Sequence, residues 1–311
     1  LSVLVTRLPD KPVQTLEQHK DVAWLAKEKA VSVLPDVGSL RMLRKTLATK
    51  NQTQAGNYLG VGDPALKEAA KTIALRSKQK IATRGANTLR SIIGANRAAV
   101  DVDMVASLEE LPDTADELKT ISKLMDPDNA RLYLRDQATQ KNVEKLKLDN
   151  YRVVQFATHG LMAGDFQGLF EPALVMTPTL SEVLQEGDGL LTASEITELK
   201  FNADLIVLSA CNTAAPDGTP GAEGMSGLGR AFFYAGGRSL LLTHWAVLSD
   251  AAVSMTTGMF EHMEQDKGAN KAEAARRSKL DLINSKDKPY YAHPLFWAPF
   301  VIVGEAGTRI D

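Results

Sequence analysis

The sequence predicts an α/β protein whose central sheet is mostly parallel and carries helices on both faces. Three observations support this prediction. Several short apolar runs are continuous rather than alternating, as in strands that are buried on both faces. From about residue 57 onward, such runs alternate with segments of helical spacing. Polar residues and glycines follow the apolar runs directly, as they do where ligands bind at the carboxyl ends of parallel strands.

The predicted elements alternate along the chain. Strands are expected at 57–62, 131–134, 152–157, 205–208, 238–243 and 297–303, with a short strand at 31–34 that Pro35 ends. Helices are expected at 16–29, 112–125, 138–148, 224–235, 249–264 and 269–284. Thr192 and Glu195 fit a capping box at the start of one more helix. Residues 161–190, which hold four glycines, are expected to form a hairpin excursion.

The 311 residues are enough for one large domain or two moderate ones. We predict an amino-terminal portion, residues 1–56, packed on a core of residues 57–311. Because the chain opens with Leu1 rather than Met, we interpret it as a fragment of a longer protein. No apolar segment approaches the ~20 residues of a membrane span, and no signal peptide is visible. We therefore expect no membrane partner and a cytoplasmic location.

The composition excludes several function classes. A hydrophobic content of 44% and a charged content of 24% are typical of a soluble globular protein. The net charge is −2, and no single-sign block is long enough for a nucleic-acid surface. Cys211 is the only cysteine, which excludes an internal disulfide.

Two predicted strand ends carry the two groups that a cysteine nucleophile needs. Cys211 follows the run 205–208, and His159 follows the run 152–157. A thiolate paired with an imidazole attacks a peptide carbonyl. Gly160 has no Cβ, so a substrate carbonyl can approach its N–H closely. The N–H groups of Gly160 and Cys211 are therefore the candidates for an oxyanion hole.

The spacing alone leaves other interpretations open. Cys211 is equally well read as a small buried hydrophobe, with His159 as a hydrogen-bonded loop residue. A zinc site of Cys211, His159 and His244 lacks any short ligand spacing. Gly227-Leu228-Gly229 lacks the third glycine of a dinucleotide turn, which makes a nucleotide-binding protein a weaker alternative. We expect that neither a metal nor an organic cofactor is needed.

Several motifs together are more specific than any of these residues alone. They are Phe156-Ala157-Thr158-His159-Gly160, Leu208-Ser209-Ala210-Cys211-Asn212-Thr213, Gly227-Leu228-Gly229-Arg230-Ala231-Phe232, His244-Trp245-Ala246-Val247, His293-Pro294 and Trp297-Ala298-Pro299-Phe300. In order, spacing and strand context they resemble the CHAT domain family of caspase- and separase-like cysteine peptidases. The resemblance is dense from about residue 58 to residue 305 and thinner before that.

The resemblance implies a caspase-like three-layer α/β/α sandwich with Cys211 as nucleophile and His159 as general base or ion-pair partner. It implies a cysteine endopeptidase that cleaves a specific protein or peptide substrate through a thioester. If bacterial relatives are a guide, the pathway is one of stress, cell death or defence, and activity awaits a protein activator. The alternative is a non-catalytic protein-interaction module that keeps the caspase-like shape.

The resemblance also implies a substrate pocket along residues 243–250, with His244, Trp245, Ser249 and Asp250 as its candidate residues. Many relatives place an aspartate four residues after the tryptophan, where this chain has Ser249. Ser249 is a good helix cap, and Asp250 in the first turn would complement the helix dipole. We therefore predict an uncharged P1 side chain. Relatives often carry tetratricopeptide repeats before this domain; none is visible here, which fits a fragment.

Overall fold

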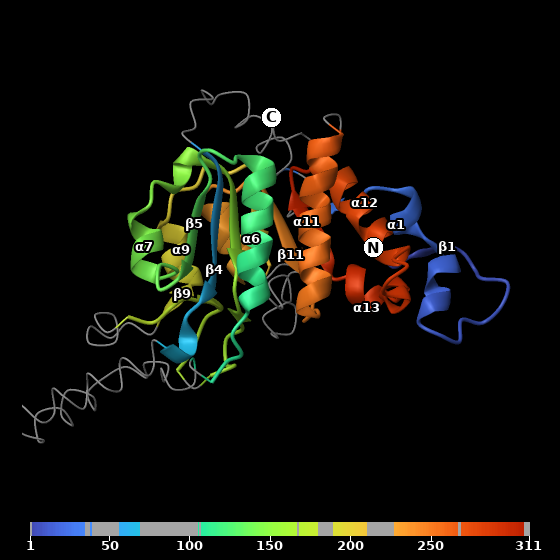
Figure 1. Cartoon of the computed structure of the whole chain (residues 1–311), viewed down its shortest axis with the longest axis horizontal. Coiled ribbons are helices and arrows are strands. Elements are labelled where there is room, and N and C mark those ends of the chain that lie inside the picture. Colours follow the sequence, from blue (N-terminus) through green and yellow to red (C-terminus); the bar gives the residue numbers. More distant parts are fainter. Residues whose placement is uncertain are drawn as a thin grey trace, which may run out of the picture.

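The computed structural model describes residues 2–34, 38, 56–68, 105, 107–166, 168–179, 189–209, 227–266 and 269–307. Cys211 lies outside the described residues. The described chain is organised around a seven-stranded sheet with the order β3-β12-β11-β10-β6-β4-β5 (Figure 1). These strands are β3 (Ser32–Val33), β4 (Gly56–Pro64), β5 (Arg131–Arg135), β6 (Tyr151–Ala157), β10 (Leu205–Leu208), β11 (Ser239–Thr243) and β12 (Phe300–Gly304).

The sheet is mostly parallel. Strands β5, β4, β6, β10 and β11 run in one direction, while β12 pairs antiparallel with β11 and parallel with β3. The continuous apolar runs predicted this arrangement, since both faces of the central strands are buried. The predicted fold class is therefore confirmed.

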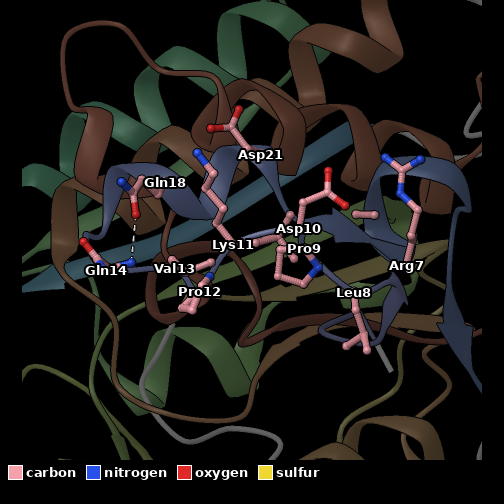
Figure 2. A pocket seen from close by; sticks show the side chains of 12 residues that line it. Arg7, Leu8, Pro9, Asp10, Lys11, Pro12, Val13, Gln14, Gln18 and Asp21 are labelled. Atoms are coloured by element: carbon pink, nitrogen blue, oxygen red, sulfur yellow. Dashed lines mark hydrogen bonds between the residues drawn. The ribbon is translucent and has the colours of Figure 1, made fainter.

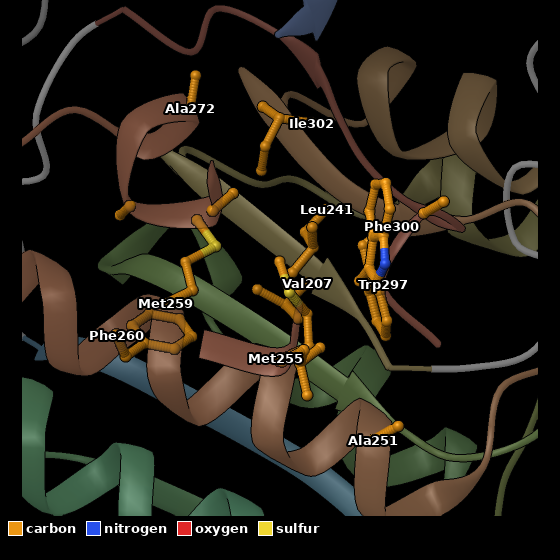
Figure 3. Close-up of a cluster of buried hydrophobic side chains, with 14 of the residues drawn as sticks. Val207, Leu241, Ala251, Met255, Met259, Phe260, Ala272, Trp297, Phe300 and Ile302 are labelled. Atoms are coloured by element: carbon orange, nitrogen blue, oxygen red, sulfur yellow. The ribbon is translucent and has the colours of Figure 1, made fainter. Parts of the chain in front are cut away.

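Helices cover both faces, because successive side chains of a strand point to opposite sides. One face bears α6 (Pro112–Met125), α11 (Ser249–Gln265), α12 (Lys271–Ile283) and α13 (Pro294–Trp297). The other bears α7 (Gln140–Lys145), α9 (Ala193–Glu198) and α10 (Gly227–Tyr234). Figure 3 shows part of the first face, where Val207 and Leu241 of the sheet lie near Met255 of α11 and near Trp297. The result is a three-layer α/β/α sandwich.

A second, three-stranded sheet stands beside the first. Its antiparallel strands are β7 (Gly160–Leu161), β8 (Ala173–Val175) and β9 (Leu190–Thr192). It accounts for the predicted excursion after His159. The capping box that the sequence predicted is confirmed, because the Thr192 side chain accepts from the Glu195 N–H and Glu195 accepts from the Thr192 N–H. Single turns of 3-10 helix at Leu148–Asn150 and Pro289–Ala292 complete the core.

The amino-terminal residues differ from the prediction. In place of one helix over 16–29, the structure has a 3-10 turn at Glu17–Asp21, then β2 (Ala23–Trp24), then the short α1 (Leu25–Glu28). Strand β2 pairs with β1 (Val5–Arg7). Val22, Trp24 and Ala26 are buried, an alternation of two residues rather than a helical stripe. Trp24 packs against Trp297, with the ring centroids 5.7 Å apart.

The last predicted strand, 297–303, begins too early. Residue 297 closes α13, and β12 begins three residues later. Trp297 is fully buried, and its indole N–H donates to the Ala292 carbonyl at 3.0 Å. That bond is local to the turn before α13, and the apolar pattern of the sequence did not separate this helical turn from the strand that follows it.

Candidate active site

The candidate site lies at one edge of the main sheet. Strands β4, β6, β10 and β11 are parallel, so their carboxyl ends share that edge. In the pairing of β6 with β10, Phe156 lies opposite Leu208. His159 comes three residues after Phe156, and Cys211 comes three residues after Leu208. The two strands that precede the histidine and the cysteine in the sequence are therefore neighbours that end at the same level of the sheet.

Two hydrogen bonds with Val175 of β8 hold the backbone at His159 and its neighbour Thr158. The Val175 N–H donates to the His159 carbonyl at 2.9 Å, and the buried Thr158 hydroxyl donates to the Val175 carbonyl at 2.6 Å. The His159 ring nitrogen Nε2 lies 2.6 Å from the Glu109 carbonyl oxygen. A carbonyl only accepts, so Nε2 carries the hydrogen, and in the neutral ring Nδ1 is the free base. This assignment of the tautomer follows from the hydrogen-bond pattern.

The segment that supplies this carbonyl is itself anchored. Glu110, the next residue, lies 3.5 Å from Arg135, which also contacts Asp63 at 3.3 Å and Glu68 at 3.1 Å. Arg135 is the last residue of β5 and Asp63 the last but one of the neighbouring β4, and both have positive φ, at 50° and 46°. Such backbone conformations cost of order 1–3 kcal/mol for residues other than glycine. The surrounding contacts therefore fix the backbone at Asp63 and Arg135, beside the segment whose Glu109 carbonyl orients His159.

Gly160 begins β7, where it lies opposite Leu174. Because the Val175 N–H donates to the carbonyl of residue 159, Gly160 and Leu174 form a non-hydrogen-bonded pair of the antiparallel ladder. The backbone N–H groups of such a pair point away from the partner strand. The Gly160 N–H is therefore not committed to β8. The other predicted oxyanion donor, the Cys211 N–H, lies outside the described residues.

The predicted pocket segment follows β11, the next strand after β10. The His244 N–H donates to the Pro299 carbonyl at 3.0 Å, and the Trp245 indole N–H donates to the Leu295 carbonyl at 3.1 Å. Leu248 is 56% exposed and Leu295 is 50% exposed. An apolar rim of Trp245, Leu248 and Leu295 therefore flanks the end of β11.

The predicted cap at the start of α11 is wrong. Leu248 occupies the N-cap position without a side-chain hydrogen bond, and Ser249 is the first helical residue. The placement of Asp250 in the first turn is confirmed. The helix start therefore has no side-chain cap, and the carboxylate of Asp250 in its first turn complements the helix dipole.

Asp250 has partners that the sequence did not indicate. Its carboxylate lies 2.5 Å from the Lys288 ammonium, which also contacts the Tyr291 hydroxyl at 3.2 Å. Burial pushes the pKa of Asp250 upward, but hydrogen bonds from Lys288 and Tyr291 outweigh it, so the pKa lies below its ordinary value. The same bond to Asp250 raises the pKa of Lys288. Both groups are therefore charged at neutral pH, and the Asp250 carboxylate is already neutralised by an internal cation.

Three residues near the site escaped prediction from sequence. Glu109 contributes a backbone carbonyl, which any residue type supplies, so no pattern marks it. Lys288 is 38 positions from the aspartate that it pairs with. Glu117 lies on the buried side of α6, where it accepts hydrogen bonds from the Gln155, Ser209 and Thr256 side chains. The one sign of Glu117 in the sequence is that a polar residue occupies a core position of the predicted helix.

Other features of the described residues lie away from this edge. A cavity of about 560 Å³ sits in the amino-terminal arm, where Figure 2 shows Arg7, Asp10, Lys11, Gln14 and Asp21 around it. None of the predicted site residues lines it. In the described part of the chain, no three His, Cys, Asp or Glu side chains are grouped so as to hold a metal ion. Nor is any described helix sufficiently long and apolar to span a membrane.

Comparison with protein families gives a match over almost the whole sequence. A family model for the CHAT domain matches residues 3–305. Mouse tetratricopeptide repeat protein 28 is 32% identical over 117 residues, which are 37% of this chain and 4% of that protein. The chain therefore corresponds to a small part of that relative.

Solved structures with similar architecture have little sequence in common with this chain. The Arg-specific cysteine proteinase gingipain R matches with a TM-score of 0.47 and 9% identity, over 82% of this chain and 47% of its own. A complex of the pro- and mature domains of Porphyromonas gingivalis RgpB matches with a TM-score of 0.47 and 10% identity, over 85% and 52%. Separase from Saccharomyces cerevisiae, in complex with securin, matches with a TM-score of 0.44 and 13% identity, over 89% and 14%.

Proposed function

The chain belongs to the CHAT domain family, and we propose that it is a cysteine endopeptidase with Cys211 as nucleophile and His159 as base. The observation that carries the proposal is the orientation of His159. Its Nε2 is bound to the Glu109 carbonyl, which leaves Nδ1 as the free base. His159 follows β6, and β6 is the neighbour of β10, the strand that precedes Cys211 in the sequence. A base oriented by a third group beside a nucleophile is the arrangement that covalent catalysis requires.

The proposed reaction has two steps. In the first, Nδ1 of His159 takes the thiol proton, and Sγ of Cys211 bonds to the scissile carbonyl carbon. The carbon–nitrogen bond then breaks, and the amine leaves with the proton from the imidazolium. In the second step, His159 takes a proton from water, whose oxygen bonds to the thioester carbon. The carbon–sulfur bond breaks, the acid leaves, and the thiol regains its proton.

The developing oxyanion needs donors that are in place beforehand. We assign this role to the backbone N–H groups of Gly160 and Cys211. The non-hydrogen-bonded pairing of Gly160 with β8 supports the first of these, because its N–H is not used by the ladder. Loss of one such donor costs roughly 10²–10³ in kcat in other acyl-transfer enzymes.

The mechanism is tested on the nucleophile and the base directly. Cys211→Ala and His159→Ala should each abolish cleavage of a proteome-derived peptide library, because neither variant can form the thioester. His262→Ala is the matched control, since His262 pairs with Asp281 at 2.5 Å on α11 and α12 and should leave cleavage unchanged. Wild-type cleavage should also persist in chelator, because the proposed steps use only Cys211, His159 and water. Cleavage by either site variant at the wild-type rate contradicts the mechanism.

Thiol reactivity separates this proposal from the alternative of a non-catalytic interaction module. Cys211 is the only cysteine, so iodoacetamide reports on it alone. A thiol that reacts near neutral pH, with an apparent pKa below the ordinary ~8.5, supports the peptidase. A thiol that stays inert in every condition, including with a protein activator present, supports the module. A protein or peptide partner is proposed in either case.

For specificity, we propose that an uncharged P1 side chain lies beside Trp245, Leu248 and Ser249. The ion pair between Asp250 and Lys288 supports this, because a basic P1 residue would have to displace Lys288 from Asp250. His244 and Asp250 complete the proposed pocket wall. Substrate binding at this rim would bury apolar surface of Leu248, which is exposed in the free protein.

Lys288→Met tests this interpretation of the pocket. Removal of the ammonium leaves the Asp250 carboxylate without its internal cation, so the variant should cleave peptides with arginine or lysine at P1 about tenfold better relative to neutral residues. Asp250→Asn in the same background should abolish the gain. Lys286→Met, which removes an exposed lysine two positions away, is the control. A wild-type protein that already prefers basic P1 residues, and loses that preference in Asp250→Asn, contradicts the proposal.

A further inference from the structure

Glu117 is a carboxylate in the middle of the protein. It lies on α6 and is 1% exposed, between the main sheet and α11. An isolated charge in such a place costs several kcal/mol, so buried carboxylates are kept only where hydrogen bonds satisfy them. Burial raises the pKa of Glu117, while hydrogen bonds from Thr256, Ser209 and Gln155 oppose that shift.

Three side chains converge on one oxygen of this carboxylate. Oε1 of Glu117 lies 2.6 Å from the Gln155 amide nitrogen, 2.8 Å from the Ser209 hydroxyl and 2.6 Å from the Thr256 hydroxyl. The Gln155 side-chain oxygen in turn accepts from the buried Tyr58 hydroxyl at 2.7 Å. Because all these bonds are short, the side chains are fixed in direction as well as in position.

The elements that meet at Glu117 are the ones that carry the proposed site. Gln155 is on β6, four residues before His159. Ser209 directly follows β10, two residues before Cys211. Thr256 is on α11, which begins at the proposed substrate pocket. One carboxylate therefore joins three elements. They are β6, which precedes the proposed base, β10, which precedes the proposed nucleophile, and α11, which begins at the proposed pocket.

We propose that Glu117 is a positioning residue, which aligns β6, β10 and α11 with one another so that His159 and Cys211 meet in a reactive geometry. The proposal rests on the proposed function. Glu117 does not touch substrate; it acts through Gln155, Ser209 and Thr256. A displacement of about 1 Å at a reacting group can reduce a rate by about 10²-fold, so a hub of this kind has a kinetic effect beyond its effect on stability.

The alternative is that this network only stabilises the core. Glu117→Gln separates the two, because the amide keeps the size of the side chain but loses the charge that draws three donors together. We expect kcat to fall about tenfold with KM unchanged. The rate of Cys211 alkylation by iodoacetamide at pH 7 should fall similarly, as the thiol pKa returns toward its ordinary ~8.5.

Two controls identify a purely structural effect. Ile121→Ala removes a buried side chain from the same helix, and it should lower stability without changing kcat or alkylation per folded molecule. At the other end of the network, Thr256→Val should reproduce part of the loss of kcat and of alkylation rate. Thr256→Ser keeps the hydroxyl, so both rates should stay at the wild-type value. Urea unfolding of each variant gives the folded fraction.

The outcomes are distinct. A wild-type protein that cleaves no peptide and has an unactivated thiol overturns the proposed function and the positioning role together. An activated wild-type thiol whose pH profile is unchanged in Glu117→Gln overturns the positioning role alone. Equal losses of kcat in Ile121→Ala and Glu117→Gln at matched stability overturn it as well.

Discussion

Strands β6 and β10 have a buried polar cluster at each end, and the two clusters are built differently. At the amino ends, Asp204 accepts two hydrogen bonds from Arg152, at 3.0 and 2.9 Å, and also contacts Arg238. Lys271 and Glu305 lie close by, with 3.7 Å between their charged atoms. At the carboxyl ends, the single carboxylate of Glu117 is bound by neutral amide and hydroxyl groups.

The difference suggests that the two clusters have different roles in the same sheet. In the amino-end cluster, charges compensate one another, so removal of a single member leaves a buried charge unpaired. In the carboxyl-end cluster, removal of one neutral donor leaves the charge with its other partners, and the change is mainly one of direction. We therefore infer that the amino-end cluster contributes stability and that the carboxyl-end cluster contributes orientation at the proposed site.

The largest expected effect comes from breaking the amino-end cluster. Asp204→Asn removes the charge of the carboxylate that Arg152 and Arg238 both contact, and we expect a loss of roughly 3–5 kcal/mol in the free energy of unfolding. Asp149→Asn removes an exposed carboxylate from the turn before β6 and should change stability by less than about 0.5 kcal/mol. Urea unfolding at neutral pH measures both.

The same variant sharpens the comparison through its kinetics. In Asp204→Asn, iodoacetamide should alkylate Cys211 at the wild-type rate per folded molecule. The reason is that the amino-end cluster lies at the opposite ends of the strands from His159. A variant that keeps its stability but loses thiol reactivity would reverse the assignment of the two clusters.

The sequence predicted what depends on local pattern. Continuous apolar runs indicated the strands of the parallel sheet, and the Thr192 capping box was recognised because its two residues are three positions apart. The prediction of a helix at 16–29 was wrong because Trp24 packs against Trp297, far away in the chain, and this burial overrides helical spacing. The lesson is that contacts between distant segments decide short elements.

The site shows the same limit. His159 was recognisable by its motif and its place after a strand, and Asp250 by its place at a helix start. The partners that set their chemistry, the Glu109 carbonyl and Lys288, come from other elements and have no sequence pattern. Glu117 is visible as a core polar position, but only the fold shows that its three donors lie on the strands and helix of the site. Chemistry-bearing residues are thus easier to predict than the groups that orient them.

The smallest expected effect distinguishes the clusters by pH. Lys271 is 1% exposed, and burial, together with Arg238 and Arg152, lowers its pKa from 10.5 to about 8 despite the nearby Glu305. Between these values the unfolded chain binds more protons than the folded one, so the free energy of unfolding rises with pH. Glu117 has a raised pKa and acts in the opposite sense on the acid side.

We therefore expect Lys271 to increase wild-type stability by on the order of 1–2 kcal/mol between about pH 7.5 and pH 9.5, measured by urea unfolding at each pH. Lys271→Met should reduce this slope. A remainder should persist, because Lys279 donates to the Phe300 carbonyl at 2.7 Å and burial lowers its pKa to about 8 as well. Glu117→Gln should leave the alkaline slope intact, because it removes neither of these two lysines. An unchanged slope in Lys271→Met would show that the amino-end lysine keeps its proton through the pairing with Glu305, and that both clusters are held at fixed charge.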